Sequence, residues 1–175
     1  APVNQVHADA EVFDVNRAGI WVNAPDIGLH EELSRLAPDN PLATVVNSVF
    51  STLDIDFARR VSPAEAISLL NSETASQRHA RRVIPDGIEI KITSSIPLAS
   101  GLGSGAAVSV AIIRALSAHF GQPFTDEQVN EIAYEVEKIH HGTPSGIDNT
   151  VVTYGKPIFF INKVGKPMVF GMSGK

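Results

Sequence analysis

Ile-Pro-Leu-Ala-Ser-Gly-Leu-Gly-Ser-Gly-Ala-Ala occupies residues 96–107 and joins a strand-like segment to an apolar helix. Its three glycines, Gly101, Gly103 and Gly105, allow the backbone to approach a ligand closely. The first turn of the following helix presents unpaired N–H groups and a partial positive charge. This combination is typical of a loop that binds phosphate.

The segments on both sides give this loop a rigid support. Residues 87–93 alternate between apolar and polar side chains, which predicts a half-buried strand leading into the loop. Residues 106–119 are apolar on almost every side, and a helix of this kind lies in the middle of a domain. A further helix is predicted from Thr125, its N-cap, to about Ile139, with Gln128 completing a capping box.

The amino-terminal half mixes strand and helix patterns. Residues 3–15 and 20–22 alternate loosely around a turn, which predicts two strands joined as a hairpin. Residues 42–53 place apolar side chains at helical spacing after an Asn-Pro pair. A second helix is predicted to begin at Pro63. Residues 71–82 are predicted to form an exposed loop or a fraying helix, and their arginines are expected to be solvated, with contact to a nucleotide's phosphates as the alternative.

The carboxyl-terminal part contains a loop at 142–146, a short helix that starts near Asp148, and strands at 157–161 and 167–170. An aspartate at a helix start is usually an N-cap, so capping is the structural alternative to any chemical role for Asp148.

Composition excludes several classes of function. With 175 residues, 43% hydrophobic and 19% charged, the chain can bury one core. A net charge of −5 leaves no broad basic surface, so nucleic acid is not an expected partner. There is no cysteine for a disulfide or a thiolate site. No signal-peptide pattern and no bilayer-length apolar run is seen, so we expect no membrane partner and a cytoplasmic location.

The glycine-rich stretch has three alternatives to this kind of phosphate-binding loop. Gly101, Gly103 and Ala106 match a dinucleotide-binding fingerprint, but that motif needs a βαβ unit and here a helix follows the helix. A Walker A loop requires Gly-Lys-Ser/Thr, whereas Gly105 is followed by Ala106 and Ala107. A glycine-rich helix start that binds nothing is the remaining alternative.

Residues 97–107 resemble the phosphate loop of the GHMP kinases, whose pattern is Pro-x-x-x-Gly-Leu-Gly-Ser-Ser-Ala. One position departs, because Gly105 stands where the family has its second serine. The resemblance implies that ATP and Mg²⁺ are cofactors. It implies nucleotide binding by Pro97, Ser100, Gly101, Leu102, Gly103, Ser104, Gly105 and Ala106.

Residues 137–149 read Glu-Lys-Ile-His-His-Gly-Thr-Pro-Ser-Gly-Ile-Asp-Asn and resemble the mevalonate kinase branch of this family, in which a Glu precedes His-Gly-Asn-Pro-Ser-Gly-Val-Asp-Asn. The resemblance implies that Glu137 and Ser104 are magnesium ligands and that Asp148 is the catalytic base or orienting group. It implies substrate contacts by His141, Gly142, Ser145 and Asp148.

A zinc hydrolase is the rival class of enzyme for this segment. Glu137 and His141 share a helix face at spacing i, i+4, and His140 adds a further nitrogen. A convincing third ligand is lacking, and the phosphate loop would remain unexplained.

The resemblance covers nearly the whole chain. It implies an α/β (α+β) fold of the ribosomal protein S5 domain 2-like type, with a mixed sheet and helices packed on one side. Residues 1–175 would then form the amino-terminal, ATP-binding domain, without the family's first strand and loop and without its carboxyl-terminal domain.

The implied reaction is ATP-dependent phosphorylation of the primary alcohol of mevalonate to 5-phosphomevalonate, a step of isoprenoid precursor synthesis. Phosphomevalonate kinase, mevalonate 3-kinase and a non-catalytic nucleotide-binding homologue are the alternatives. The expected partners are mevalonate and ATP, and a homodimer is left open.

Overall fold

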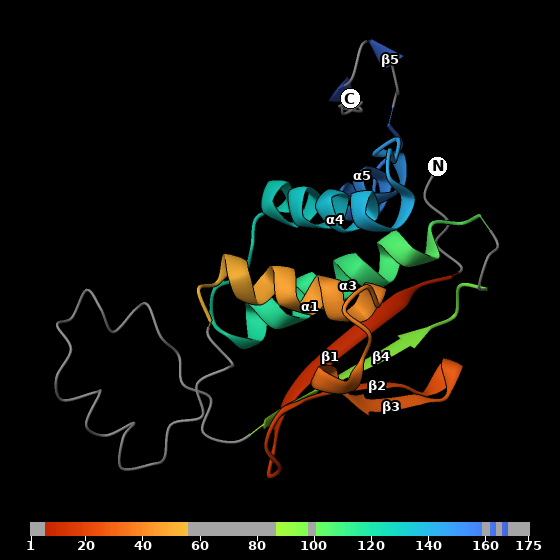
Figure 1. Cartoon of the computed structure of the whole chain (residues 1–175). Helices are drawn as coiled ribbons and strands as arrows, with labels where there is room; N and C mark the ends of the chain where they lie inside the picture. The colour runs from red at the N-terminus through yellow and green to blue at the C-terminus, as the bar shows by residue number, and fades with distance from the viewer. Residues whose placement is uncertain (1–5, 56–86, 98–100, 159–161, 164–165, 168–175) are drawn as a thin grey trace, which may run out of the picture.

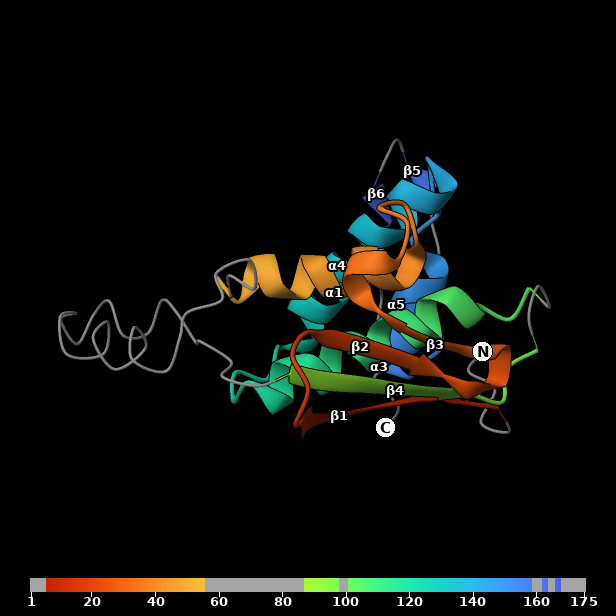
Figure 2. The same cartoon turned by 60° about the horizontal axis from the view of Figure 1, so that its bottom comes forward.

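The computed structural model describes residues 6–55, 87–97, 101–158, 162–163 and 166–167. In this part of the chain a four-stranded sheet carries its helices on one face (Figures 1 and 2). The strands of the sheet are β1 (Ala8–Val15), β2 (Ile20–Ala24), β3 (Leu29–Glu32) and β4 (Gly87–Ser94). The α-helices are α1 (Pro41–Thr52), α3 (Ser104–His119), α4 (Asp126–His141) and α5 (Ile147–Tyr154), and the 3-10 helices are η1 (Pro25–Ile27) and η2 (Leu33–Arg35).

The sheet is mixed, with the strand order β1-β4-β2-β3. Strand β4 pairs antiparallel with β1 and parallel with β2. The predicted hairpin of the first two strands is therefore wrong, because β4 lies between them. The hairpin is formed instead by β2 and β3, which are joined through η1 and Gly28 at φ +66°. Alternation predicted the strands, but it carries no information on which strands are partners.

Helix α3 forms the centre of the molecule. It packs against β1 and β4 on one side and against α1, α4 and α5 on the others. The core between them contains fully buried side chains from the sheet and from α3, namely Val22, Ile88, Ile90, Ile112, Ile113 and Leu116. This environment explains why α3 is apolar on almost every side and confirms its predicted central position.

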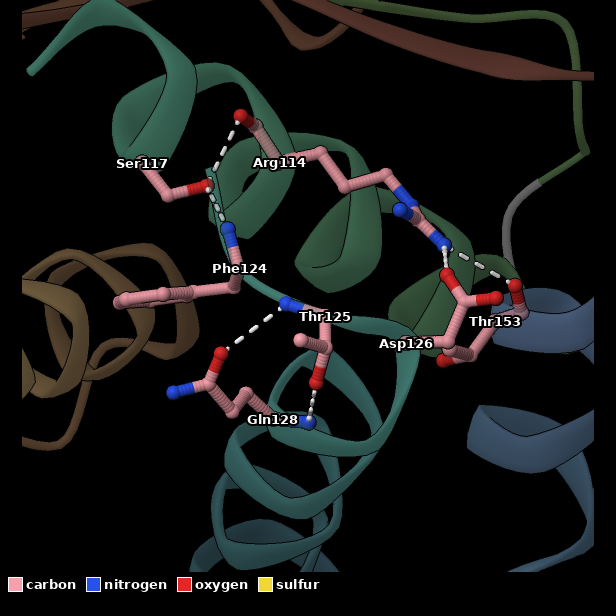
Figure 3. A network of polar contacts seen from close by, with 7 residues as sticks. All are labelled: Arg114, Ser117, Phe124, Thr125, Asp126, Gln128 and Thr153. Atoms are coloured by element: carbon pink, nitrogen blue, oxygen red, sulfur yellow. Dashed lines mark hydrogen bonds and ion pairs between the residues drawn. The ribbon is translucent and has the colours of Figure 1, made fainter. Parts of the chain in front are cut away.

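Side chains cap two of the helices, and the capping box of α4 is as predicted. Asn40 caps α1, since its side chain accepts a hydrogen bond from the N–H of Leu42 at 2.9 Å. At the start of α4, Thr125 Oγ1 accepts from the N–H of Gln128 at 3.4 Å, and the N–H of Thr125 donates to Gln128 Oε1 at 2.9 Å (Figure 3). These bonds satisfy N–H groups that a helix start leaves unpaired.

Arg114 ties three helices together. Its Nη2 donates to Asp126 Oδ1 of α4 at 2.6 Å and to the carbonyl oxygen of Thr153 in α5 at 3.1 Å (Figure 3). The bonds join the carboxyl-terminal half of α3 to the first residue of α4 and to the end of α5. They fasten α5 at the end opposite to its first turn.

Several predictions fall wholly or partly outside the described residues. The helix start at Pro63, the loop at 71–82 and most of the strands at 157–161 and 167–170 belong to this group. The described part of that carboxyl-terminal region forms two short paired strands, β5 (Asn162–Lys163) and β6 (Lys166–Pro167). Among the described helices, none has the length and apolar character that crossing a membrane requires.

Candidate functional site

The glycine-rich loop ends at a helix start that no side chain caps. Gly103 is the N-cap residue of α3, with φ +69°, and it provides no side-chain hydrogen bond. Gly101 is also left-handed, with φ +72°. A non-glycine residue is strained in this conformation, so the two glycines are what allows the loop to turn into α3 as it does. The first-turn N–H groups of α3 are therefore available to an anion.

Two carboxylates flank this helix start. A Cβ atom added to Gly103 would lie 3.4 Å from Cγ of Asp148 and 3.6 Å from its Oδ2. A Cβ atom added to Gly105 would lie 3.6 Å from Oε1 of Glu137. Asp148 comes from α5 and Glu137 from α4. The structure thus brings both predicted acidic residues to the phosphate loop, each beside a different glycine.

Asp148 does not cap its helix. Helix α5 begins at Ile147 and has Gly146, at φ +76°, as its N-cap residue, with no side-chain cap bond. The Oγ atom of Ser145 accepts a hydrogen bond from the N–H of Ile147 at 3.3 Å. The capping alternative for Asp148 is therefore wrong, and its carboxylate is left to face the loop.

Glu137 is the less exposed of the two carboxylates, with 15% of its side chain accessible. Its Oε2 lies 3.7 Å from Nε2 of His141, one helical turn further along. Within the described residues, no three His, Cys, Asp or Glu side chains converge as a metal cluster would require. A third ligand for the zinc alternative is not found in this part of the chain.

Lys138, although adjacent to Glu137 in sequence, is engaged elsewhere. Its Nζ lies 2.6 Å from Glu135 Oε1 and 4.7 Å from the ring centroid of Tyr134. The hydrogen bond to Glu135 is the main cause that raises the pKa of Lys138. The side chain of Lys138 is thus paired with Glu135 and packed over Tyr134.

A cleft of about 440 Å³ opens beside the loop, on the side of Glu137. Its polar end is formed by Ser104, Gly105, Glu137 and His141. Its apolar walls come from the β2–β3 hairpin, α1, β4, α3 and α4, and include Leu29, Leu42, Val45, Ile92, Val108 and Val136. Asp148 does not line it. The volume falls within the range of small-molecule sites, roughly 300–1,000 Å³.

Two further polar groups in this cleft were missed by sequence reasoning. Asp26 Oδ2 accepts a hydrogen bond from the N–H of Ser94 at 2.6 Å, which fixes the carboxylate at the end of β4. Ser109, in the middle of α3, is buried and lines the cleft. The available signal for Ser109 was a serine within the apolar middle of α3. The turn containing Asp26 gave no signal beyond a break between two elements.

The remaining predicted site residues have no shown part in this cleft. Pro97 and Leu102 are exposed, and Ser100 lies outside the described residues. Ala106 is buried in the first turn of α3. Gly142 ends α4 with φ +68° and connects it to the loop before α5. Pro97, Leu102 and Gly142 do not line the cleft.

The chain belongs to a family of small-molecule kinases. Residues 64–156, more than half of the chain, match the family model of the GHMP kinases N terminal domain. This assignment confirms the resemblance stated above for the phosphate loop.

The curated relatives that the chain matches include mevalonate kinases. That of Thermococcus sibiricus is 38% identical over 117 residues, which cover 63% of this chain and 33% of the relative. That of Archaeoglobus fulgidus is 45% identical over 91 residues, covering 51% of this chain and 32% of the relative. The chain spans between a quarter and a third of the length of the first curated relatives it matches.

Solved structures of the same family share the fold. The L. major mevalonate kinase in complex with R-mevalonate superposes with a TM-score of 0.61 at 24% identity, over 95% of this chain and 42% of that one. The Methanococcus jannaschii mevalonate kinase gives 0.57 at 22% identity, over 84% of this chain and 42% of that one. These likenesses confirm the expected ribosomal protein S5 domain 2-like fold.

Proposed function

We propose that residues 1–175 are the amino-terminal, nucleotide-binding domain of an ATP-dependent kinase that phosphorylates the primary alcohol of mevalonate. The observation that carries this proposal is the pair of carboxylates, Asp148 and Glu137, placed on two sides of a glycine-rich helix start. The names of the relatives support mevalonate as the acceptor. The product would be 5-phosphomevalonate, an isoprenoid precursor.

The nucleotide has a suitable place in the cleft on the Glu137 side of the loop. Its apolar walls suit a flat base, and Ser109 and Asp26 offer hydrogen bonds to polar groups on the base or the ribose. The triphosphate would then reach the uncapped N–H groups at the start of α3, where the helix dipole favours negative charge.

Magnesium fits the oxygen groups at the polar end of this cleft. Mg²⁺ prefers oxygen ligands and keeps several waters, and the Glu137 carboxylate and the Ser104 hydroxyl both line the cleft there. Gly105 has no side chain to fill the space next to Glu137 Oε1. When bound, the ion would supply positive charge that offsets the charge of the phosphate oxygens.

The acceptor alcohol would lie on the Asp148 side of the loop, because the nucleotide occupies the other side. In phosphoryl transfer, the alcohol oxygen bonds to the γ-phosphorus while the bond to the β,γ-bridging oxygen breaks. The Asp148 carboxylate would accept the alcohol proton during this attack. The lack of a capping bond leaves the carboxylate free for that task.

An Asp148→Asn substitution in the full-length protein that carries these residues tests the proposal. We expect the turnover of mevalonate to fall by about 10²–10⁴-fold, the usual contribution of a general base, with ATP affinity changed little. Glu127→Gln is the control, since Glu127 is also an exposed carboxylate in the first turn of a helix.

ADP release and calorimetric ATP titration give the two readouts. A panel of mevalonate, phosphomevalonate and homoserine identifies the acceptor. Unchanged turnover in the Asp148→Asn variant would refute the catalytic role, and turnover only with another alcohol would refute mevalonate as substrate.

A further inference from the structure

A buried polar cluster lies directly behind Asp148. The next two residues, Asn149 and Thr150, are 2% and 1% exposed. Asn149 Nδ2 donates to Asn130 Oδ1 at 2.7 Å, and Thr150 Oγ1 lies 3.4 Å from the same oxygen and 2.6 Å from the carbonyl oxygen of Gly146. Buried donors are costly to leave unpaired, so these bonds define the position of the first turn of α5.

One side-chain oxygen of α4 thus meets two consecutive residues of α5. It accepts from Asn149 Nδ2, and it shares the single proton of Thr150 Oγ1 with the nearer carbonyl oxygen of Gly146. A shift of α5 along its axis, or a rotation about it, would break at least one of these bonds. Asn149 Nδ2 also approaches the backbone oxygen of Asn130, at 3.4 Å. Asp148 precedes Asn149 and Thr150 in the same helical turn. The bonds that hold these two residues therefore also hold the backbone position from which the Asp148 side chain projects.

Asn130 and Glu137 lie on the same face of α4. They are seven residues apart, which is close to two full turns of an α-helix. Helix α4 therefore carries Glu137 to Gly105 directly, and it holds Asp148 at Gly103 through Asn130. The spacing of the two carboxylates across the phosphate loop is determined by one rigid helix.

From this geometry we propose that Asn130 is a positioning residue, which acts through Asn149 and Thr150 to hold Asp148 in place for proton transfer. The inference rests on the proposed function, since it assumes that Asp148 accepts the proton of the acceptor alcohol. It goes beyond that function by assigning a role in the reaction to a residue of mid-α4 that lies outside both sequence motifs.

Two substitutions of similar size at this position separate hydrogen bonding from packing. Asn130→Asp keeps an oxygen acceptor for both donors, whereas Asn130→Leu removes it. In the full-length protein we expect Asn130→Leu to lower kcat by about 10–100-fold, because a displacement of a reacting group by about 1 Å reduces the rate by up to about 100-fold. The KM for ATP should change by less than about threefold. Asn130→Asp should keep kcat within about threefold of the wild type.

Arg114→Met is the structural control. It removes the bond from α3 to the carbonyl oxygen of Thr153 in α5, together with the ion pair to Asp126, and leaves the first turn of α5 untouched. We expect it to lower the melting temperature while kcat per nucleotide-binding site stays within about threefold of the wild type. Should Asn130→Leu fail to fold, Thr150→Val keeps the side-chain shape, removes one donor and takes its place in the comparison.

The outcomes distinguish this inference from the proposed function. The positioning role is overturned if Asn130→Leu keeps the wild-type kcat, or if Thr150→Val does where that variant replaces it. It is also overturned if Asn130→Asp or Arg114→Met loses as much kcat as Asn130→Leu. If Asp148→Asn itself keeps its turnover, the proposed function fails as well. Both the positioning role and the proposed function are supported if kcat falls in Asn130→Leu, or in Thr150→Val where it replaces that variant, but not in the controls, and if turnover collapses in Asp148→Asn.

Discussion

Alanine at Gly103 should impair both stability and turnover, for separable reasons. At φ +69° a Cβ atom costs about 1–2 kcal/mol relative to glycine. For a domain of this size, that loss lowers the melting temperature by about 2–8 °C. The new Cβ atom would also lie 3.4 Å from Cβ and Cγ of Asp148, in van der Waals contact, so it would fill the space between the loop and the carboxylate. We expect kcat to fall by about tenfold or more, since an acceptor excluded from this space or displaced within it loses its alignment with Asp148.

Gly101→Ala is the matched control for this experiment. Gly101 has nearly the same backbone angle, φ +72°, but nothing lies within 4 Å of an added Cβ atom. Thermal unfolding followed by circular dichroism should show similar losses for the two variants. Steady-state ADP release at saturating ATP should show the additional loss of kcat only for Gly103→Ala. Equal kcat values in the two variants would refute the reasoning that Asp148 works against this face of the loop.

Two further predictions concern the loop and a helix cap. Gly105→Ser restores the hydroxyl of the family pattern, and its Cβ atom fits at 3.6 Å from Glu137 Oε1. In a titration, we expect this variant to need a lower Mg²⁺ concentration for half-maximal ATP binding than the wild type. A higher Mg²⁺ requirement would contradict the assignment of Glu137 to the metal. Thr125→Ala removes half of the capping box, which should destabilise the protein by about 0.5–2 kcal/mol in urea unfolding. ATP affinity should not change, since the cap lies about three helical turns from Glu137 and more than four from His141.

Local signals predicted the elements well where short-range physics decides them. The alternation at 87–93 became β4, and the capping box at Thr125 starts α4 as expected. Strand pairing was predicted wrongly, because it depends on residues far apart in the chain. Nothing in the alternation of 8–15 indicates that its partner is β4 instead of the nearer β2.

The candidate site was predictable to the extent that motifs mark it. The glycines and the resemblance pointed to Glu137 and Asp148, and the structure brings both to the loop. Asp26 and Asn130 carried no such signal. Asp26 lies in a turn and Asn130 on a helix face, and both come close to the site only when the chain folds. No residue spacing along the sequence predicts this proximity.

The central place of β4 in the sheet has a consequence for the order of assembly. Residues of β1 pair with residues of β4 that follow them by 72 to 86 positions, as in Val15↔Gly87 and Ala8↔Ser94. On a ribosome, β1 emerges long before its partner exists, and pairing across such a separation is slow. Until residue 94 is released, the nascent chain carries β1 without a neighbour and the inner edge of β2 uncovered. Chaperone binding during this interval would protect two edges that are open to aggregation.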